Sequence, residues 1–416
     1  MHRVRMSLPY FEQYGWRSEI VMVNEKFSES TKDYLLSENI PKDIIVHKVN
    51  AFPKKITRKF GLGSLGLRSI YHYKKYVSKL LKHKKYDLIY FSTTEFAVTI
   101  LGTYWKRKFK IPYIIDYQDA WHTTYYLDKP KLERPPKYWF SYRLNKFLEP
   151  KALKNVDALI SVSQGYIDDL KARYKYLIKT PFEVITFGAF APDFNFVFEN
   201  EQRFKLPYKS SIDIINLVYV GRGGYDLKDA ITLLFTAFKK GIMEDFSNFN
   251  KLRFHFIGTS YAPKGKGNPT IIPIAKKMDL LDYVSEQTDR ISYYEGINSL
   301  TNADGLIIIG SNDPQYTASK IYPYILANKP IIAFFHPESS AYKIIEDCNA
   351  GKVISLLDDS NTIQNIYIEL HSMLHNPRES HVDWDKFKIY DATNMTKRQC
   401  ELFDKVIKQV RKDYGN

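Results

Sequence analysis

The sequence contains 416 residues, of which 44% are hydrophobic and 26% are charged. At about 150 residues per domain this length predicts two or three domains, and the composition excludes a disordered chain and a lone small binding module. The longest apolar stretches, such as 96–101 and 331–335, are far shorter than the roughly 18 residues of a membrane-spanning helix, and the N-terminus has no apolar signal core. Cys348 and Cys400 are the only cysteines, which excludes a disulfide framework and favours a reducing cytoplasm.

Lysine and arginine total 61 against 46 aspartates and glutamates, and the excess is concentrated in residues 44–86. This segment contains no acid and twelve basic residues: Lys48, Lys54, Lys55, Arg58, Lys59, Arg68, Lys74, Lys75, Lys79, Lys82, Lys84 and Lys85. Such a run is typical of a solvated face, but it also fits a surface that meets an anionic membrane or a phosphorylated lipid. Nucleic acid is a third class of partner, although no nucleic-acid motif accompanies the run.

Short β-branched or aromatic runs alternate with longer amphipathic segments, which predicts βαβ units on parallel sheets. After a helix-like stretch at residues 1–14, the expected strands of the first half are 18–23, 44–48, 88–92, 113–116, 158–161 and 183–186. The expected strands of the second half are 214–220, 253–257, 291–294, 305–309, 330–334 and 351–354, with helices at 227–241, 319–326, 340–347 and 395–414. The pattern therefore predicts two doubly wound halves.

The segment 192–211 lacks a clear periodicity, and we place the connection between the two halves there. A parallel α/β domain normally opens with a strand and a Gly-bearing turn, whereas this sequence opens with a helix-like stretch. A first strand is therefore expected upstream of Met1. The alternative is a truncated chain.

The strand at 214–220 runs into Gly221, Arg222, Gly223 and Gly224, and Lys228 follows in the first turn of the next helix. Free backbone N–H groups and the positive end of a helix dipole suit a diphosphate, and the two cations would add charge-assisted contacts. The alternative is a tight turn whose glycines only supply positive φ. A second glycine turn, at Gly258, follows the next strand and is a weak signal alone.

A second cation follows another strand end, after Gly310 and Ser311. Thr317 or Ser319 is the expected N-cap of the next helix, which would place Lys320 in its first turn, where a cation opposes the dipole. An anion beside Lys320 would explain this position. The alternative is an exposed lysine on a helix.

In the first half, Asp116, Asp119, Trp121 and His122 follow the strand at 113–116, and open α/β sheets bind ligands at such carboxyl ends. The two carboxylates could orient hydroxyl groups or transfer protons. The alternative is that Asp116 caps a turn and Trp121 belongs to the core. The carboxylates are too few, and lack a histidine cluster, to indicate a metal site.

The order and spacing of these motifs resemble the two-domain GT-B glycosyltransferases, and most closely glycosyltransferase family 4 (group 1 type), over nearly the whole chain. The motifs that carry the resemblance are Arg3-Val4-Arg5, Tyr14-Gly15-Trp16-Arg17, Ile115 to Trp121, Asp157 to Ser163, Val184 to Gly188, Tyr219 to Arg222, Ala303-Asp304, and Ser319 to Tyr324 before Lys329-Pro330. Two positions depart from the family pattern: Gln315 and Pro323 stand where the family often carries glutamates.

The resemblance implies an α/β GT-B architecture of two Rossmann-like domains facing across a cleft. Residues 1–200 would form an acceptor-side domain, 201–394 a nucleotide-sugar-binding domain, and 395–416 a helix crossing back to the first domain. Donor binding would fall to Gly221, Arg222, Gly223, Gly224, Lys228, Gly258, Ser311, Ser319, Lys320 and Tyr324. Catalysis would rest on Arg222 and Lys320 at the leaving diphosphate, with Asp116 and Asp119 positioning hydroxyl groups.

The expected activity is transfer of a sugar, with retention of configuration and without a metal or other cofactor, from a nucleotide-sugar donor to a cell-surface polysaccharide or lipid-linked saccharide precursor. The expected location is the cytoplasm, at the inner face of the membrane through residues 44–86, with no nucleic-acid partner. Two alternatives stay open: a nucleotide-sugar 2-epimerase of the same fold, which needs an acid/base set for which Asp119 and His122 are a thin match, and an inactive scaffold that binds a membrane or a partner enzyme.

Overall fold

The computed structural model describes residues 2–28, 33–38, 40–124, 127, 134, 137–314, 319–357, 360–375 and 380–414. The chain divides into two compact units. Unit 1 comprises Met1–Lys32, Ile40–Phe187 and Ala392–Asn416, and unit 2 comprises Asp33–Asn39 and Gly188–Asp391. Among the described residues, no helix is both long and apolar enough to cross a membrane.

The strands of unit 1 form two parallel sheets. The smaller sheet pairs β1 (Glu19–Val23) with β2 (Ile45–Val49). The larger follows the chain in the order β3 (Ile89–Ser92), β4 (Tyr113–Tyr117), β5 (Ala158–Ser161) and β6 (Phe182–Val184). Its central strands β4 and β5 are buried throughout, as continuous apolar runs in a parallel sheet require. Within the described part of unit 1, no strand joins the two sheets.

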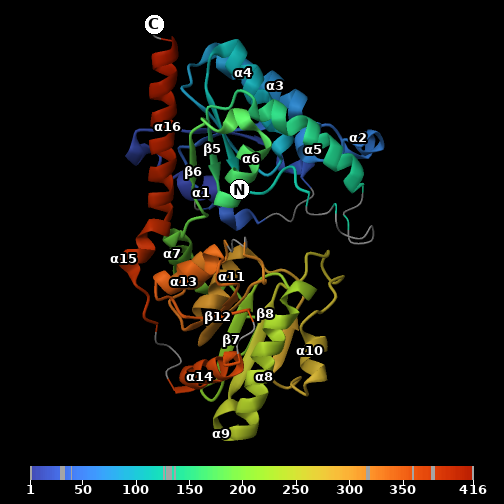
Figure 1. Ribbon diagram of the computed structural model, residues 1–416, viewed down its shortest axis with the longest axis vertical. Coiled ribbons are helices and arrows are strands. Elements are labelled where there is room, and N and C mark those ends of the chain that lie inside the picture. Colours follow the sequence, from blue (N-terminus) through green and yellow to red (C-terminus); the bar gives the residue numbers. More distant parts are fainter. Residues whose placement is uncertain are drawn as a thin grey trace. The chain divides into compact units, whose positions relative to one another are not determined.

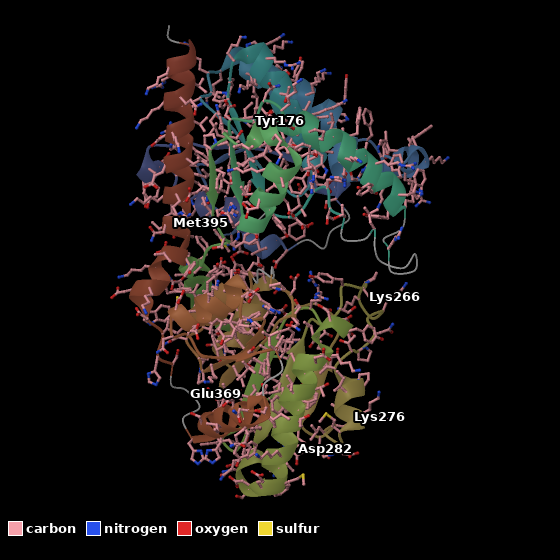
Figure 2. All side chains as sticks on the ribbon, viewed as in Figure 1. Tyr176, Lys266, Lys276, Asp282, Glu369 and Met395 are labelled. Atoms are coloured by element: carbon pink, nitrogen blue, oxygen red, sulfur yellow. The ribbon has the colours of Figure 1, made fainter. Side chains whose placement is uncertain are left out.

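The helices of unit 1 surround these sheets. They are α1 (His2–Ser7), α2 (Lys54–Thr57), α3 (Leu65–His83), α4 (Ile100–Phe109), α5 (Tyr138–Leu153), α6 (Gln164–Arg173) and α16 (Ala392–Tyr414). The last of these, drawn in red, lies beside β5 and β6 (Figure 1). Its Phe403 packs 5.3 Å from Trp16, and its buried Met395 is labelled in Figure 2. The final helix thus completes the unit in which the chain begins.

Unit 2 is built on one parallel sheet of six strands. They are β7 (Ile215–Val220), β8 (Leu252–Ile257), β9 (Val284–Gln287), β10 (Gly305–Ile309), β11 (Ile331–Phe335) and β12 (Lys352–Ser355). Their order in the sheet is β12-β11-β10-β7-β8-β9, so the winding direction reverses between β7 and β10. In doubly wound folds, ligands bind at the carboxyl ends of the strands beside such a reversal.

The helices of unit 2 are α7 (Ala191–Glu199), α8 (Lys228–Glu244), α9 (Phe246–Phe249), α10 (Ile272–Lys277), α11 (Tyr293–Thr301), α12 (Ile321–Leu326), α13 (Ser340–Asp347), α14 (Thr362–His375) and α15 (Trp384–Phe387). Helices α8 and α14 pack against each other and against the sheet (Figure 1). Phe235 and Phe238 of α8 are fully buried there against Phe254 of β8. This core fixes β7, β8 and the turns at their carboxyl ends.

The structure corrects two expected elements. Residues 291–294 do not form a strand. The strand at this place in the sheet is β9, at Val284–Gln287, and helix α11 begins at Tyr293. The cause is a capping box, in which the Ser292 side chain accepts from the Glu295 N–H and the Glu295 side chain accepts from the Ser292 N–H. The helix-like stretch at 1–14 is also broken, because α1 ends at Ser7 and only a short 3-10 turn follows, at Glu12–Tyr14.

The connection expected at 192–211 contains structure that belongs to unit 2. Helix α7 occupies its start, and the ring of Phe196 lies 4.6 Å from that of Tyr294 in α11. Burial of these aromatic rings draws residues 188–200 into unit 2, so the compact units divide after Phe187 and after Asp391. The sequence predicted the boundary between the two units only approximately. Helix α7 is short and has only four phenylalanine and valine residues, so its hydrophobic periodicity is too weak to identify it as a helix.

Candidate functional site

The Gly-rich turn lies at the carboxyl end of β7, beside the reversal of the sheet. The Gly221 N–H donates to the Ile257 carbonyl at 3.0 Å, and the Gly223 N–H donates to the Thr259 carbonyl at 2.8 Å. These two hydrogen bonds pair the turn with the end of β8 and with the residues that directly follow it. A Cβ atom at Gly223 would lie 2.6 Å from Thr270 Oγ1, so only glycine fits there.

Lys320 approaches the same turn from the other side of the reversal. It directly precedes α12, and its Nζ donates to the Tyr219 hydroxyl at 2.7 Å and to the Ile309 carbonyl at 3.0 Å. The Tyr219 hydroxyl in turn donates to the Arg222 carbonyl at 2.7 Å. One hydrogen-bonded chain therefore connects the carboxyl ends of β7 and β10 with the start of α12.

The site carries excess positive charge. Burial, and then the nearby Arg222 guanidinium, lower the pKa of Lys320 to about 7. Arg222 makes a two-pronged ion pair with Asp226, with N–O distances of 2.9 and 2.5 Å. The Arg222 side chain is 39% exposed in this pair. One carboxylate thus faces two cations, and the site has the electrostatics of an anion-binding site.

Several residues expected to bind the donor meet here. Gly221, Arg222 and Lys320 converge, and a Cβ at Gly221 would lie 3.4 Å from Lys320 Nζ. Tyr324 is buried beneath them, where its hydroxyl accepts from the Val220 N–H at 2.6 Å and donates to the Val220 carbonyl at 3.1 Å. Tyr324 therefore supports the turn. Donor binding by these residues stays a prediction.

The other residues predicted to bind the donor have fewer described contacts with Arg222 and Lys320. Gly258 follows β8 with φ of +75°, a conformation that favours glycine, and Ser311 follows the neighbouring strand β10. Ser319 and Lys228 are exposed, and Lys228 begins α8 with no described side-chain contact to Arg222 or Lys320.

The helix carrying Lys320 begins later than expected. Lys320 occupies the N-cap position and lies outside the first helical turn, and its side chain makes no capping bond. Of the predicted caps and the departures from the family pattern, Thr317 and Gln315 lie outside the described residues, and Pro323 lies in α12.

Sequence reasoning missed Tyr219 and Asp226. Tyr219 lies in a buried strand, where the sequence predicts that an aromatic residue belongs to the hydrophobic core. No neighbouring residue in the sequence indicates that its hydroxyl forms hydrogen bonds. Asp226 stands four positions after Arg222, a spacing at which opposite charges meet in helical turns, so a signal for it was present.

In unit 1, Asp116 belongs to a buried polar network. It and Arg3 are both 0% exposed, and Arg3 Nε lies 2.8 Å from Asp116 Oδ2. The same oxygen accepts from the side chains of Tyr90, Ser92 and Gln118, at 3.1, 2.8 and 2.6 Å. Arg3 also donates to the Ile185 and Thr186 carbonyls at the end of the sheet. The geometry therefore gives Asp116 a structural role, and positioning of hydroxyl groups by it stays a prediction.

The other predicted residues after β4 separate into surface and interior. Asp119 is exposed, and its carboxylate accepts from the Ala120 N–H at 2.8 Å. Trp121 is buried, stacks 5.6 Å from Phe96 and donates from Nε1 to Asn145, which matches the core alternative. His122 is also buried. Among the described residues, no group of three or more His, Cys, Asp or Glu side chains is arranged to hold a metal ion.

Comparison with known proteins gives a family match for part of the chain and the fold for nearly all of it. Residues 28–188 match the sequence model of Glycosyltransferase Family 4. Comparison with curated proteins finds no matching sequence. A glycosyltransferase from Rickettsia africae resembles the structure with a TM-score of 0.62 and 13% identity, over 98% of this chain and 94% of that chain.

Two further solved structures show the same arrangement. Sucrose-phosphate synthase from Thermosynechococcus elongatus has a TM-score of 0.57 and 13% identity, over 97% of this chain and 92% of its own. Anabaena HepE in complex with UDP and glucose has a TM-score of 0.56 and 14% identity, over 97% and 94%. The predicted fold class, α/β with two Rossmann-like domains, is confirmed. This chain has the two-domain GT-B fold, and its residues 28–188 match the sequence model of Glycosyltransferase Family 4.

Proposed function

We propose that the protein is a glycosyltransferase that takes a sugar from a nucleotide-sugar donor. The observation that carries the proposal is the meeting of Lys320 and Arg222 over the Gly221 turn, at the reversal of the unit 2 sheet. A similar structure, Anabaena HepE, has been solved with UDP and with UDP-glucose. A diphosphate is the anion that this set of cations and backbone N–H groups suits.

The chemistry follows from the charge of the leaving group. When the bond between the sugar and the diphosphate breaks, negative charge grows on the diphosphate oxygens. A guanidinium and an ammonium held in place before the reaction stabilise that charge more in the transition state than in the ground state. The two cations also supply the positive charge that a metal ion would otherwise bring, so the proposal includes a metal-independent reaction. Retention of configuration is included on the family resemblance alone.

Thermal unfolding in a panel of nucleotide sugars tests donor binding. A ligand at 100 times its dissociation constant stabilises the folded protein by about 2.7 kcal/mol. The double variant Arg222→Ala with Lys320→Met, which removes both cations, should lose this shift, whereas Lys276→Met, at an exposed lysine of α10 labelled in Figure 2, should keep it. Identifying the products then separates transfer from 2-epimerisation. Absence of any nucleotide-sugar shift would contradict the proposal and favour the inactive scaffold.

The proposed acceptor is a lipid-linked or cell-surface saccharide precursor, reached through a membrane-facing surface on unit 1. A patch after β2, here called the α2 patch, exposes Ile56, Phe60 and Leu62 beside Lys55, Arg58 and Lys59. Phe60 is 74% exposed. Exposed apolar side chains among cations are typical of surfaces that enter the interface of anionic membranes.

The α2 patch continues onto helix α5. A Cβ at Gly61 would lie 2.9 Å from the ring of Phe140, so the patch rests against the first turn of this helix. The adjacent Trp139 is 64% exposed, and aromatic residues of this kind anchor proteins at the water–membrane interface.

Three of the twelve cations of residues 44–86 do not contribute free charge to this surface. Arg68 is buried and donates to the carbonyls of Phe52 and Phe27, while Lys48 and Lys84 pair with Glu25 and Glu19. Burial works against ionisation of Glu19, but its bonds from Lys84, Tyr86 and His47 prevail and lower its pKa to about 2. The basic surface is therefore smaller than composition indicates.

Sedimentation with anionic liposomes at low salt tests the membrane surface. Charge reversal at Lys74, Lys75, Lys82 and Lys85, or Ile56→Ser with Phe60→Ser, should release the protein. Phe198→Ser is the matched control, because Phe198 is an equally exposed aromatic residue of unit 2. If the unaltered protein ignores anionic liposomes at low ionic strength, this part of the proposal fails.

A further inference from the structure

Two histidines lie side by side at the C-terminal end of helix α14, in unit 2. His371 and His375 are four positions apart, and the centres of their rings lie 4.4 Å from each other, with the ring planes tilted by 30°. Glu369, labelled in Figure 2, marks this part of the helix. Residues four apart share one face of a helix, and two histidines at this spacing can hold one metal ion between them.

A hydrogen bond sets the tautomer of the His375 ring. Its Nδ1 lies 2.8 Å from the His371 carbonyl oxygen. A carbonyl oxygen only accepts, so Nδ1 carries the hydrogen, and the other nitrogen of the neutral ring, Nε2, keeps its lone pair. Histidines that bind metals commonly donate their second ring nitrogen to a backbone carbonyl in this way, which fixes the ring and makes it a better ligand.

The distance between the two rings fits a shared ion. A zinc–nitrogen bond is about 2.1 Å long, so two imidazoles bonded to one ion at neighbouring coordination positions bring their ring centres to about 4.5–5 Å. The observed separation of 4.4 Å is close to this value. His371 is half-buried and His375 is exposed, so an ion can reach the pair from solvent.

The surroundings of the two rings favour a positive ion. His375 lies in the last turn of α14, where the unpaired carbonyl groups and the negative end of the helix dipole gather. The Asp245 carboxylate, which directly follows α8, also lies within electrostatic range of His371. A hydrogen bond from the Asn248 side chain lowers the pKa of Asp245 most, and a positive charge on His371 lowers it further. Because this interaction is mutual, Asp245 attracts a cation held at His371.

The ligand atoms select the kind of ion. Imidazole nitrogens suit zinc, nickel and copper, whereas magnesium and calcium require oxygen ligands. Among the described residues, no third His, Cys, Asp or Glu side chain completes the set. Water would therefore fill the remaining coordination positions, and the affinity should follow the general order for nitrogen ligands, with copper above nickel and zinc and with manganese weakest.

Packing is the alternative role of these rings. Tyr367 stacks on the buried Phe249 at 5.3 Å, and His371 continues this row at 6.2 Å from Tyr367. Stacking accounts for His371, but the exposed His375 adds little to a core. We propose that His371 and His375 form a two-histidine clamp that binds one divalent transition-metal ion and stabilises the end of α14. The clamp shares no residue with the proposed donor site, so the inference does not rest on the proposed function.

Isothermal titration calorimetry with zinc chloride, nickel chloride or copper sulfate tests the clamp in protein without an affinity tag. The unaltered protein should bind one ion that His371→Gln and His375→Gln each bind at least tenfold more weakly. Magnesium chloride should not compete with it. His83→Gln is the matched control and should change nothing, because His83 is also exposed in the last turn of a long helix, α3, but has a lysine four positions before it.

A variant that keeps the number of histidines tests their spacing. Ser372→His combined with His375→Ser moves the second imidazole to the position next to His371, on a different face of the helix. Both altered positions are exposed, so the fold should tolerate the exchange. The ion should then bind as weakly as it does to His375→Gln. Equal binding by this double variant and by the unaltered protein would overturn the inference.

Thermal unfolding with and without zinc separates metal binding from packing. Zinc at 100 times its dissociation constant should raise the Tm of the unaltered protein and of His83→Gln, relative to the same protein in EDTA, and should not raise it in the variants that break the clamp. A pair of rings that only packs would instead lower the Tm of those variants equally in zinc and in EDTA. That result, or the absence of any bound ion that the variants lose, overturns the inference.

Discussion

Both units place charged side chains at the carboxyl ends of parallel strands, but the two sets differ in how their charge is balanced. In unit 1, the Asp116 carboxylate is matched by the Arg3 guanidinium, and the neutral side chains of Tyr90 and Ser92 donate to the same carboxylate oxygen. In unit 2, Lys320 and Arg222 share the single carboxylate of Asp226. A position at the end of a strand therefore does not by itself identify a binding site; a charge that the fold leaves unbalanced does.

The largest effect should come from removing the positive charge of the buried Arg3–Asp116 pair in unit 1. Arg3→Met leaves Asp116 buried without its cation, and breaking a buried pair in this way costs about 3–5 kcal/mol. Chemical denaturation monitored by fluorescence should show this loss in the free energy of unfolding. The double variant Arg3→Met with Asp116→Asn removes both charges and should recover most of it. Equal loss in the single and double variants would show that packing, and not charge, holds this centre.

Removing a cation in unit 2 should instead lower activity. Arg222→Ala should raise the barrier to transfer by roughly 3 kcal/mol, about a hundredfold in rate, by analogy with the loss of one preorganised donor. Stability should change little, because the Arg222–Asp226 pair is exposed to solvent. Steady-state kinetics with the identified donor should show the fall mainly in kcat. A rise in KM alone would mean that Arg222 binds donor and transition state equally.

The pH dependence of donor binding sharpens the contrast further. Without ligand, Lys320 loses its proton as the pH rises through about 7, far below the ordinary lysine pKa of 10.5. A bound diphosphate favours the charged ammonium, so UDP binding should take up a proton above pH 7 and weaken by up to about tenfold per pH unit. Calorimetry in two buffers of different ionisation enthalpy measures this uptake. Lys320→Met should abolish it, and uptake that persists in this variant would assign the proton elsewhere.

The smallest effect concerns the surface cations of unit 1, where balanced and unbalanced charges also differ. Lys59 is exposed in the α2 patch, whereas Lys48, which is also exposed, lies 3.1 Å from Glu25. Lys59→Gln should weaken binding to anionic liposomes by about 1 kcal/mol, roughly fivefold, since each cation near such a surface contributes about that much. Lys48→Gln should change it far less. Equal effects would mean that net charge alone, and not the patch, governs attachment.

Local pattern predicted most of the fold. Eleven of the twelve expected strands have counterparts in the structure, because buried parallel strands appear in sequence as short apolar runs between turns. The exception, 291–294, carried the Ser292 and Glu295 capping signal of a helix, which outweighed its β-branched and aromatic composition. The sequence predicted that the sheets are parallel and doubly wound, but it did not predict the order of the strands, because strand pairing depends on contacts between distant segments.

The candidate site could be predicted where a charged residue directly follows an expected strand. Arg222 and Lys320 each follow a strand end and could be paired from that fact. The role of Asp116 in β4 could not be predicted, because its partner Arg3 lies far away in the sequence, in helix α1, and no local rule connects them. His122 was noted only as part of a thin match to an acid/base set, and the hydrogen bonds that engage both oxygens of the neighbouring Glu149 could not be inferred from the sequence, because their donors come from distant segments.

The return of α16 to unit 1 has a consequence for the order in which the protein can form during synthesis. Arg398 binds the Glu183 carboxylate and the Val184 carbonyl of β6, more than 200 positions earlier, and Gln399 donates to the Ser7 hydroxyl across 392 positions. The ribosome synthesises the whole of unit 2 before it makes these residues. The unit that is translated first is therefore the last to be completed, and until α16 emerges its β6 edge and the ring of Trp16 depend on chaperones or on the nascent chain itself for cover.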